Sequence, residues 1–395
     1  MSAEANRRRF LLTTSAAVGA ALLSPHQGTA RESPLPGPAR ASGLSPVYLG
    51  SFSWTRPPGG DLDIAGHDAG TGELARRSTV SGVPDPSFLA LSPDRRFLYA
   101  TNELVPEGRV TALSLADPHR PAVLNSRPTH GAGPTHLSVT PDGRFLLTAN
   151  YTDGSVVVHP LGDDGRLRPA THLVRHAGGS GDPHAHQILP DPSGRWVLAV
   201  DLGADAVFVY TLDSRAGRLR EHQRWDAPPG TGPRHLAFHP DGRRAYLLAE
   251  LGSTVTVLGW DATTGRITGG ATTSTRRPTA SGENFPAEIA VSRDGRAVYA
   301  SNRGDDDIAV FATDLHHTSR HPRSSPGELT LLANTPTGGA WPRHFALDPG
   351  EHALYVANQD SGTVTRLARD AGTGLLTSGT PALEAPGVCC LLFSP

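Results

Sequence analysis

One short pattern recurs six times along the chain, and it restricts the possible folds more than any other feature of the sequence. Each copy runs from one residue through five mostly apolar or small positions to a turn resembling Pro-Asp-Gly-Arg, then through a second apolar segment that ends near Asn. The two ends of every copy are 16 positions apart, and successive copies start between 48 and 56 residues apart. Such periods are typical of solenoids and propellers rather than of independent domains. The copies are Ser87–Glu103, Thr135–Tyr151, His186–Leu202, Arg234–Glu250, Ala287–Arg303 and Arg343–Gln359.

Each copy has the pattern of a β-hairpin. Pairs such as Asp142-Gly143 and Asp241-Gly242 supply the turn, because Asp and Gly tolerate the backbone angles of a tight reversal. Two more strand-like segments follow each hairpin, for example Thr254–Trp260 and Gly265–Thr272. Four antiparallel strands per period form one blade of a β-propeller.

A seventh blade is divided between the two ends of the repeat region. Cys389–Pro395 matches the first strand of the other copies and Val47–Ser51 matches the second, while Asp61–Asp68 and Glu73–Val80 supply the other two. We therefore expect an all-β, seven-bladed propeller over residues 45–395, closed by pairing of the C-terminal strand with the N-terminal blade. Closure removes the exposed strand edges that an open array would leave.

The residues before the repeats resemble an export signal. Residues 1–30 contain Asn6-Arg7-Arg8-Arg9-Phe10-Leu11, an apolar stretch from Leu11 to Leu23 and the small residues Gly28-Thr29-Ala30, which together indicate a twin-arginine signal peptide. The apolar stretch is shorter than the roughly 20 residues that span a bilayer. No Cys at the cleavage site provides a lipid anchor. We expect a disordered lead-in over residues 31–44 and a periplasmic or extracellular protein.

Composition excludes several classes of function. The formal net charge of −2 gives no field that would attract nucleic acid or anionic lipid. All 36 basic residues are Arg, and the absence of Lys excludes Schiff-base catalysis and a P-loop. His184 and His186 have the spacing of metal ligands on a strand, but no set of carboxylates completes a metal site. We expect a monomer that needs neither cofactor nor metal.

The repeat also predicts which residues surround one mouth of the central channel. If the first strand of each hairpin is innermost, the start of that strand and the end of the second strand lie at the same mouth. The start positions are Ser87, Thr135, His186, Arg234, Ala287, Arg343 and Cys389. The end positions are Ser51, Glu103, Tyr151, Leu202, Glu250, Arg303 and Gln359.

This predicted rim is charged and unequal, whereas a purely structural ring would repeat one small residue. Charges that face a narrow channel are costly to desolvate unless they are paired or used. One interpretation is that the Arg and Glu residues form salt bridges that lock neighbouring blades together. The other is an anion-accepting catalytic pocket, which explains His186 better. Cys389 is either a nucleophile or a small residue that fills the channel.

Several motifs resemble the seven-bladed lactonase family, which includes bacterial propeller-type 6-phosphogluconolactonases and fungal carboxy-muconate cyclases. They are Gly232-Pro233-Arg234-His235, Asp182-Pro183-His184-Ala185-His186, Glu250 and Ser301-Asn302-Arg303. The resemblance covers essentially residues 45–395. It implies that His186, Arg234, Glu250 and Arg303 form the active group. The residues that we expect to contact the substrate are Arg343, Glu103, Tyr151, Gln359 and His184.

A lactone needs an activated water on one side and a stabilised carbonyl oxygen on the other. His186 or Glu250 could act as the base, while Arg234 and Arg303 could bind a carboxylate or phosphate, or stabilise the oxyanion. The expected function is therefore that of an exported lactonase that opens a small-molecule sugar lactone. Two alternatives remain: a muconate-type isomerase that would use the same arginines, and a non-catalytic binding propeller. The unequal rim favours an enzyme.

Overall fold

The computed structural model describes residues 44–179, 181–313 and 328–394. These residues form 28 β-strands in seven four-stranded antiparallel sheets. The predicted signal peptide, and the predicted lead-in up to residue 43, lie outside the described residues.

Each sheet is one blade, and we number the blades in the order in which the chain reaches them. The strands are β28 (Val388–Phe393), β1 (Ser45–Ser51), β2 (Leu62–His67) and β3 (Leu74–Val80) in blade 1; β4 (Leu89–Leu91), β5 (Phe97–Asn102), β6 (Arg109–Ser114) and β7 (Ala122–Pro128) in blade 2; β8 (Pro134–Val139), β9 (Phe145–Asn150), β10 (Ser155–Pro160) and β11 (His172–Arg175) in blade 3; β12 (Ala185–Pro190), β13 (Trp196–Asp201), β14 (Ala206–Asp213) and β15 (Arg218–Asp226) in blade 4. Those of the remaining blades are β16 (Pro233–Phe238), β17 (Arg244–Ala249), β18 (Thr254–Asp261) and β19 (Arg266–Ser274) in blade 5; β20 (Phe285–Val291), β21 (Ala297–Arg303), β22 (Asp307–Ala312) and β23 (Thr330–Pro336) in blade 6; β24 (Pro342–Leu347), β25 (Ala353–Asn358), β26 (Thr363–Ala368) and β27 (Thr380–Glu384) in blade 7.

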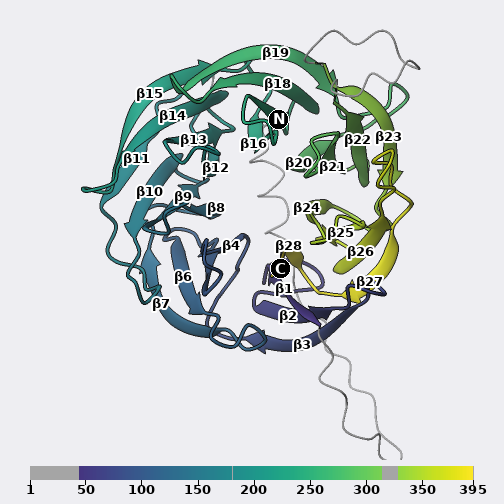
Figure 1. Ribbon diagram of the computed structural model, residues 1–395, viewed down its shortest axis with the longest axis horizontal. Helices are drawn as coiled ribbons and strands as arrows, with labels where there is room; N and C mark the ends of the chain where they lie inside the picture. Colours follow the sequence, from purple (N-terminus) through teal and green to yellow (C-terminus); the bar gives the residue numbers. More distant parts are fainter. Residues whose placement is uncertain (1–43, 180, 314–327, 395) are drawn as a thin grey trace, which may run out of the picture. The chain divides into compact units, whose positions relative to one another are not determined.

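The blades surround a central channel with the first strand of each hairpin innermost, as expected from the repeat (Figure 1). The inner strand of blade 2 is shorter than predicted, because β4 begins only at Leu89 rather than at Ser87. The all-β, seven-bladed architecture is confirmed.

Blade 1 closes the ring as predicted. Its innermost strand, β28, pairs antiparallel with β1, and Val47 lies opposite Phe393 while Gly50 lies opposite Cys390. The two pairing segments are more than 300 residues apart in the chain, so this closure is formed only in the folded state. No helix among the described residues is long and apolar enough to cross a membrane.

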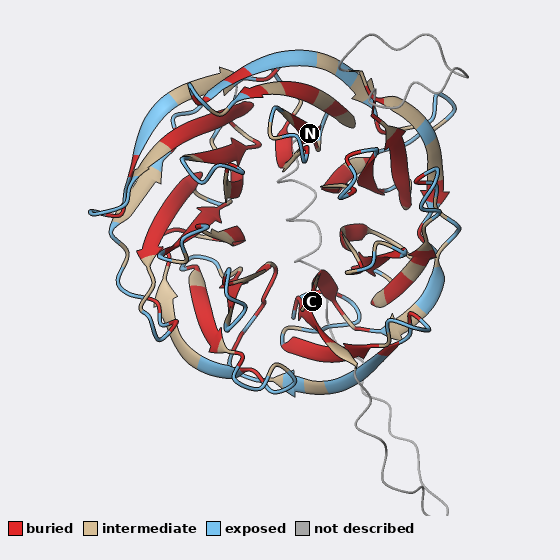
Figure 2. Ribbon diagram, viewed as in Figure 1, coloured by how far each residue is buried: buried red, intermediate tan, exposed pale blue. Residues whose placement is uncertain are grey.

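The hydrophobic core lies between neighbouring blades. One cluster joins Tyr48 and Ile64 of blade 1 to Leu98 and Leu113 of blade 2, and all four side chains are fully buried. Burial is concentrated in the inner and middle strands, whereas the outermost strands are largely exposed (Figure 2). Each blade therefore stabilises its neighbours through the apolar surface that it removes from water.

The inner strands share an irregularity that sets which side chains face the channel. In blades 3, 4, 5 and 7 the pairing of the inner strand skips one residue, which is Thr135, His186, Arg234 or Arg343. Blade 1 skips Cys389 in the same way, and blade 6 skips Ala287 and Glu288. Such a β-bulge breaks the alternation of side chains and redirects them locally. Two successive residues can therefore face the channel where regular pleating would allow one.

Candidate active site

Most of the bulged residues, and several of the residues that follow them, line a cavity in the channel. Most of the predicted start positions are there, and so are residues that directly follow them. The lining residues are Ser87, Phe88, Thr135, His186, Arg234, His235, Glu288, Arg343, His344 and Cys389.

Three of the four proposed active-group residues form one ion cluster. Oε2 of Glu250 lies 2.9 Å from Nε of Arg234 and 2.8 Å from Nη2 of Arg303. Arg234 and Glu250 belong to the inner hairpin of blade 5, and Arg303 ends β21 of blade 6. All three side chains are nearly buried, with 3%, 13% and 6% of their surface exposed. One carboxylate therefore joins two guanidinium groups at this mouth.

Backbone carbonyls fix the orientation of both arginines. Arg234 Nη1 donates to the carbonyl of Ala287, and Arg303 Nε donates to the carbonyl of Phe285 at 2.9 Å. Burial, followed by repulsion from Arg303, lowers the pKa of Arg234 to about 9, while Glu250 acts in the opposite direction. Two guanidinium groups thus share the carboxylate of Glu250, and this concentration of positive charge favours the binding of an anion or of a developing oxyanion.

His186 lies in the same cavity as Arg234. Its ring centroid is 5.0 Å from that of His235 and 5.6 Å from that of Tyr151. Burial lowers the pKa of His186 well below its ordinary value, and repulsion from Arg234 contributes next. The imidazole is therefore neutral near neutral pH. Its Nδ1 atom makes no hydrogen bond within the part of the chain that the structure describes.

Of the residues predicted to contact the substrate, Arg343 lines the same cavity as His186 and Arg234. Arg343 Nη2 lies 3.6 Å from Oε2 of Glu103, although blade 1 separates their two blades in the ring. The rings of Tyr151 and His184 are stacked at 4.6 Å, and His184 Nδ1 lies 2.8 Å from the carbonyl of Tyr151. Gln359 donates from Nε2 to Asp360 at 3.1 Å.

The start and end positions of the repeat did not predict a second group of channel residues, which includes His235 and His344. Glu288 Oε1 lies 3.2 Å from Nδ1 of His235, and its Oε2 lies 3.4 Å from Nε2 of His344. The centroid of the Phe88 ring, in blade 2, lies 4.0 Å from that of His136 in blade 3 and 6.2 Å from that of His235 in blade 5. Each of these residues directly follows a predicted start position. The repeat did not predict the β-bulges found at most of these positions, and so it did not predict that the following residues also face the channel.

This second group is buried and its ionisation is shifted accordingly. Burial lowers the pKa of His136 and His235 well below their ordinary value and lowers that of His344 to about 4. Burial also raises the pKa of Glu288. The three histidines are therefore neutral near neutral pH.

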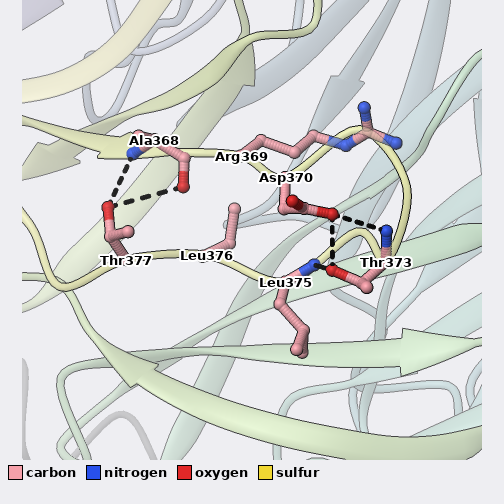
Figure 3. Close-up of a pocket in the computed structure, with 7 residues that line it drawn as sticks. All are labelled: Ala368, Arg369, Asp370, Thr373, Leu375, Leu376 and Thr377. Atoms are coloured by element: carbon pink, nitrogen blue, oxygen red, sulfur yellow. Dashed lines mark hydrogen bonds between the residues drawn. The ribbon is translucent and has the colours of Figure 1, made fainter.

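Two other features are less suited to catalysis. Burial raises the pKa of the Cys389 thiol well above its ordinary value, so the thiolate needed for nucleophilic attack is disfavoured. A separate hollow lies near the turn between β26 and β27, where Asp370 accepts hydrogen bonds from the backbone and side chain of Thr373 (Figure 3). That carboxylate stabilises its own turn. Within the described residues no group of three His, Cys, Asp or Glu side chains could hold a metal ion.

Comparison with known proteins adds three observations. The family described as "Lactonase, 7-bladed beta-propeller" matches residues 46–393. A 6-phosphogluconolactonase of Bacillus subtilis (strain 168) is 31% identical over 354 residues, which are 88% of this chain and 97% of that protein. The crystal structure of a putative 6-phosphogluconolactonase from Bacteroides fragilis is 30% identical with a TM-score of 0.79, covering 91% of this chain and all of that one. A periplasmic gluconolactonase of Pseudomonas aeruginosa is 30% identical with a TM-score of 0.80, covering 89% of this chain and 99% of that chain.

Proposed function

The chain belongs to the seven-bladed β-propeller lactonase family, and from this premise we propose that it hydrolyses a sugar lactone at the channel mouth. The observation that carries the proposal is a neutral, buried His186 in the cavity that is also lined by Arg234, the member of the Arg234–Glu250–Arg303 cluster that reaches it. The cluster would place positive charge beside the carbonyl oxygen of a lactone, and the histidine would act as the base that activates a water molecule.

In the proposed reaction, His186 accepts a proton from the attacking water through a ring nitrogen. Arg234 and Arg303 stabilise the negative charge that develops on the carbonyl oxygen, or hold a substrate carboxylate. Glu250 keeps the two guanidinium groups together and is the alternative base. The tetrahedral intermediate then expels the ring oxygen, which takes up the proton, so that the products are those of simple hydrolysis.

We propose a gluconolactone-type substrate, phosphorylated or not, because related proteins carry the names 6-phosphogluconolactonase and periplasmic gluconolactonase. Arg343, Glu103, Tyr151, Gln359 and His184 would surround the hydroxyl or phosphate groups of such a sugar. Their mixture of charge, amide and aromatic rings suits a polar ring molecule.

The test is proton release by the purified mature protein on glucono-δ-lactone and 6-phosphogluconolactone, with a chelator present. We expect turnover by the wild-type protein and its loss in His186→Ala. His352→Ala is the matched control, because that side chain is 76% exposed. Full activity of His186→Ala would remove the histidine from its assigned role. No turnover of any lactone by the wild-type protein would instead favour the isomerase or a binding propeller.

We also propose that the protein acts outside the cytoplasm, which the twin-arginine pattern of the sequence and the periplasmic relative both support. Replacing Arg7 and Arg8 together by Lys should retain the protein in the cytoplasm, as judged by fractionation of cells. Unchanged export of that double variant would contradict the route.

A further inference from the structure

Trp341 has a backbone conformation that its side chain disfavours. Its φ angle is +62°, in the left-handed region that non-glycine residues rarely occupy and that is a clear outlier for a bulky residue. Such conformations persist where the surroundings hold them, and they cluster at functional sites. Trp341 is half-buried and lies two residues before the bulged Arg343 of the channel mouth.

The repeat shows what this position ordinarily requires. Two residues before the bulge, blades 3, 5 and 1 have Gly133, Gly232 and Gly387, with φ angles of +61°, +60° and +67°. Glycine adopts these angles without steric cost. Blade 7 therefore places the bulkiest side chain at a position where three other blades have none.

Hydrogen bonds hold the backbone of Trp341 in place. Its amide donates to Asp306 Oδ1 at 2.8 Å, and its carbonyl accepts the amide of Gln359 at 3.0 Å. Asp306 comes from the neighbouring blade 6 and Gln359 from the predicted rim. These two bonds hold the backbone from which the indole projects.

The indole contacts the ion cluster directly. The guanidinium carbon of Arg303 lies 5.4 Å from the centroid of the Trp341 ring, a cation–π distance, and the ring of Phe285 lies 5.9 Å away. Arg303 is the residue that shares Glu250 with Arg234. Trp341 thus extends the polar cluster with an apolar surface.

We propose that Trp341 is a specificity-determining residue that contacts the substrate. Its indole packs against the apolar C–H surface of a cyclic sugar lactone, while Arg303 binds an oxygen atom of the same molecule. The inference rests on the proposed function and deepens it by assigning the apolar wall of the site. Ligand sites combine aromatic surface with a few placed polar groups in this way.

The test uses Trp341→Gly, which restores the residue found at the equivalent position of three other blades and so should fold. We expect KM for glucono-δ-lactone to rise about tenfold, as loss of one aromatic contact predicts, with kcat unchanged. Trp341→Phe, which retains a ring over Arg303, should have an intermediate KM. Unchanged KM in Trp341→Gly, or a fall in kcat alone, would overturn the proposal.

Arg95→Gly is the matched control. Arg95 has a φ angle of +58° in the hairpin turn of blade 2. The equivalent residues of blades 3, 5 and 6 are glycines that likewise have positive φ angles, namely Gly143, Gly242 and Gly295. This variant relieves the same backbone conformation away from Trp341. Its KM and kcat should equal those of the wild-type protein.

A binding measurement separates this inference from the proposed function. D-gluconate should change the tryptophan fluorescence of the wild-type protein, and Trp341→Gly should abolish that change. If no lactone is turned over but this result is obtained, the contact stands and the hydrolytic function fails. If lactones are hydrolysed but the fluorescence response survives in Trp341→Gly, the function stands and the contact fails.

Discussion

Nε of Arg234 lies 2.9 Å from Oε2 of Glu250, and the two residues stand at the two ends of one inner hairpin. Their separation of 16 positions is the constant offset of the repeat, so the pair is an outcome of blade geometry. The second guanidinium, that of Arg303, comes from the next blade. The cluster therefore depends both on a local hairpin and on the packing of two blades.

Glu250→Gln should reduce both activity and stability. The amide has nearly the shape of the carboxylate but lacks the charge that two nearly buried guanidinium groups share. We expect kcat/KM to fall by about 100-fold or more. The free energy of unfolding should fall by about 3 kcal/mol, because the buried arginines lose their counter-charge.

Activity assays and urea denaturation measure the two effects of Glu250→Gln. The matched control is Asp164→Asn, whose carboxylate is 52% exposed and lies 3.5 Å from Arg166. That exposed pair should contribute less than about 1 kcal/mol. Equal losses of stability in the two variants would show that the channel cluster contributes no more to the free energy of unfolding than an exposed ion pair does.

Stability should decrease as the pH falls from about 7 towards about 5. Burial lowers the pKa of His136, His186 and His235, and lowers that of His344 to about 4. Below their unfolded pKa these residues bind protons in the unfolded chain but not in the folded one. The unfolded state then gains protons preferentially, which lowers the free energy of unfolding.

Glu288 acts in the opposite direction, because burial raises its pKa and the folded state therefore takes up its proton first as the pH falls. Burial raises the pKa of Asp307 and Asp360 in the same way, but it also lowers the pKa of His67, His159 and His172, so that seven histidines oppose three carboxyl groups. Urea denaturation at several pH values measures the slope, and His352→Gln, with its exposed side chain, should leave the slope unchanged. Equal stability at pH 5 and pH 7 would contradict the prediction.

Cys389→Ala should retain lactone turnover. The thiol is buried, its pKa is raised, and a nucleophilic cysteine requires a thiolate. Iodoacetamide should accordingly leave the wild-type protein active. Cys390→Ala, at the adjacent buried cysteine, is the matched control, and loss of turnover in Cys389→Ala alone would restore the nucleophile hypothesis.

Leu391→Ala should destabilise the ring closure. Leu391 lies on β28 opposite Leu49 of β1 and is 1% exposed. Loss of its buried side chain should cost about 2–5 kcal/mol of unfolding free energy. Leu332→Ala, whose side chain is 41% exposed on β23, should cost about 0.5 kcal/mol or less. Thermal denaturation of both variants measures the difference, and a similar Tm for the two would mean that closure contributes little.

The sequence alone determined the architecture, because a repeat is a property of the chain that needs no tertiary contact to be seen. The offset of 16 positions located the inner hairpins, and the match of Cys389–Pro395 to the first strand of the other copies predicted the closure by β28. The same offset brought Arg234, Glu250 and Arg303 to one rim, where they form a single ion cluster.

The tertiary structure decided which further side chains share the channel. Regular pleating alternates side chains, so the start positions of the repeat did not predict that His235, Glu288 and His344 line the channel, which the β-bulges of their strands allow. Their contacts join residues on different blades, about 50 or more positions apart. A local pattern carries no information about such pairs, because only the packing of the neighbouring blades 5, 6 and 7 brings them together.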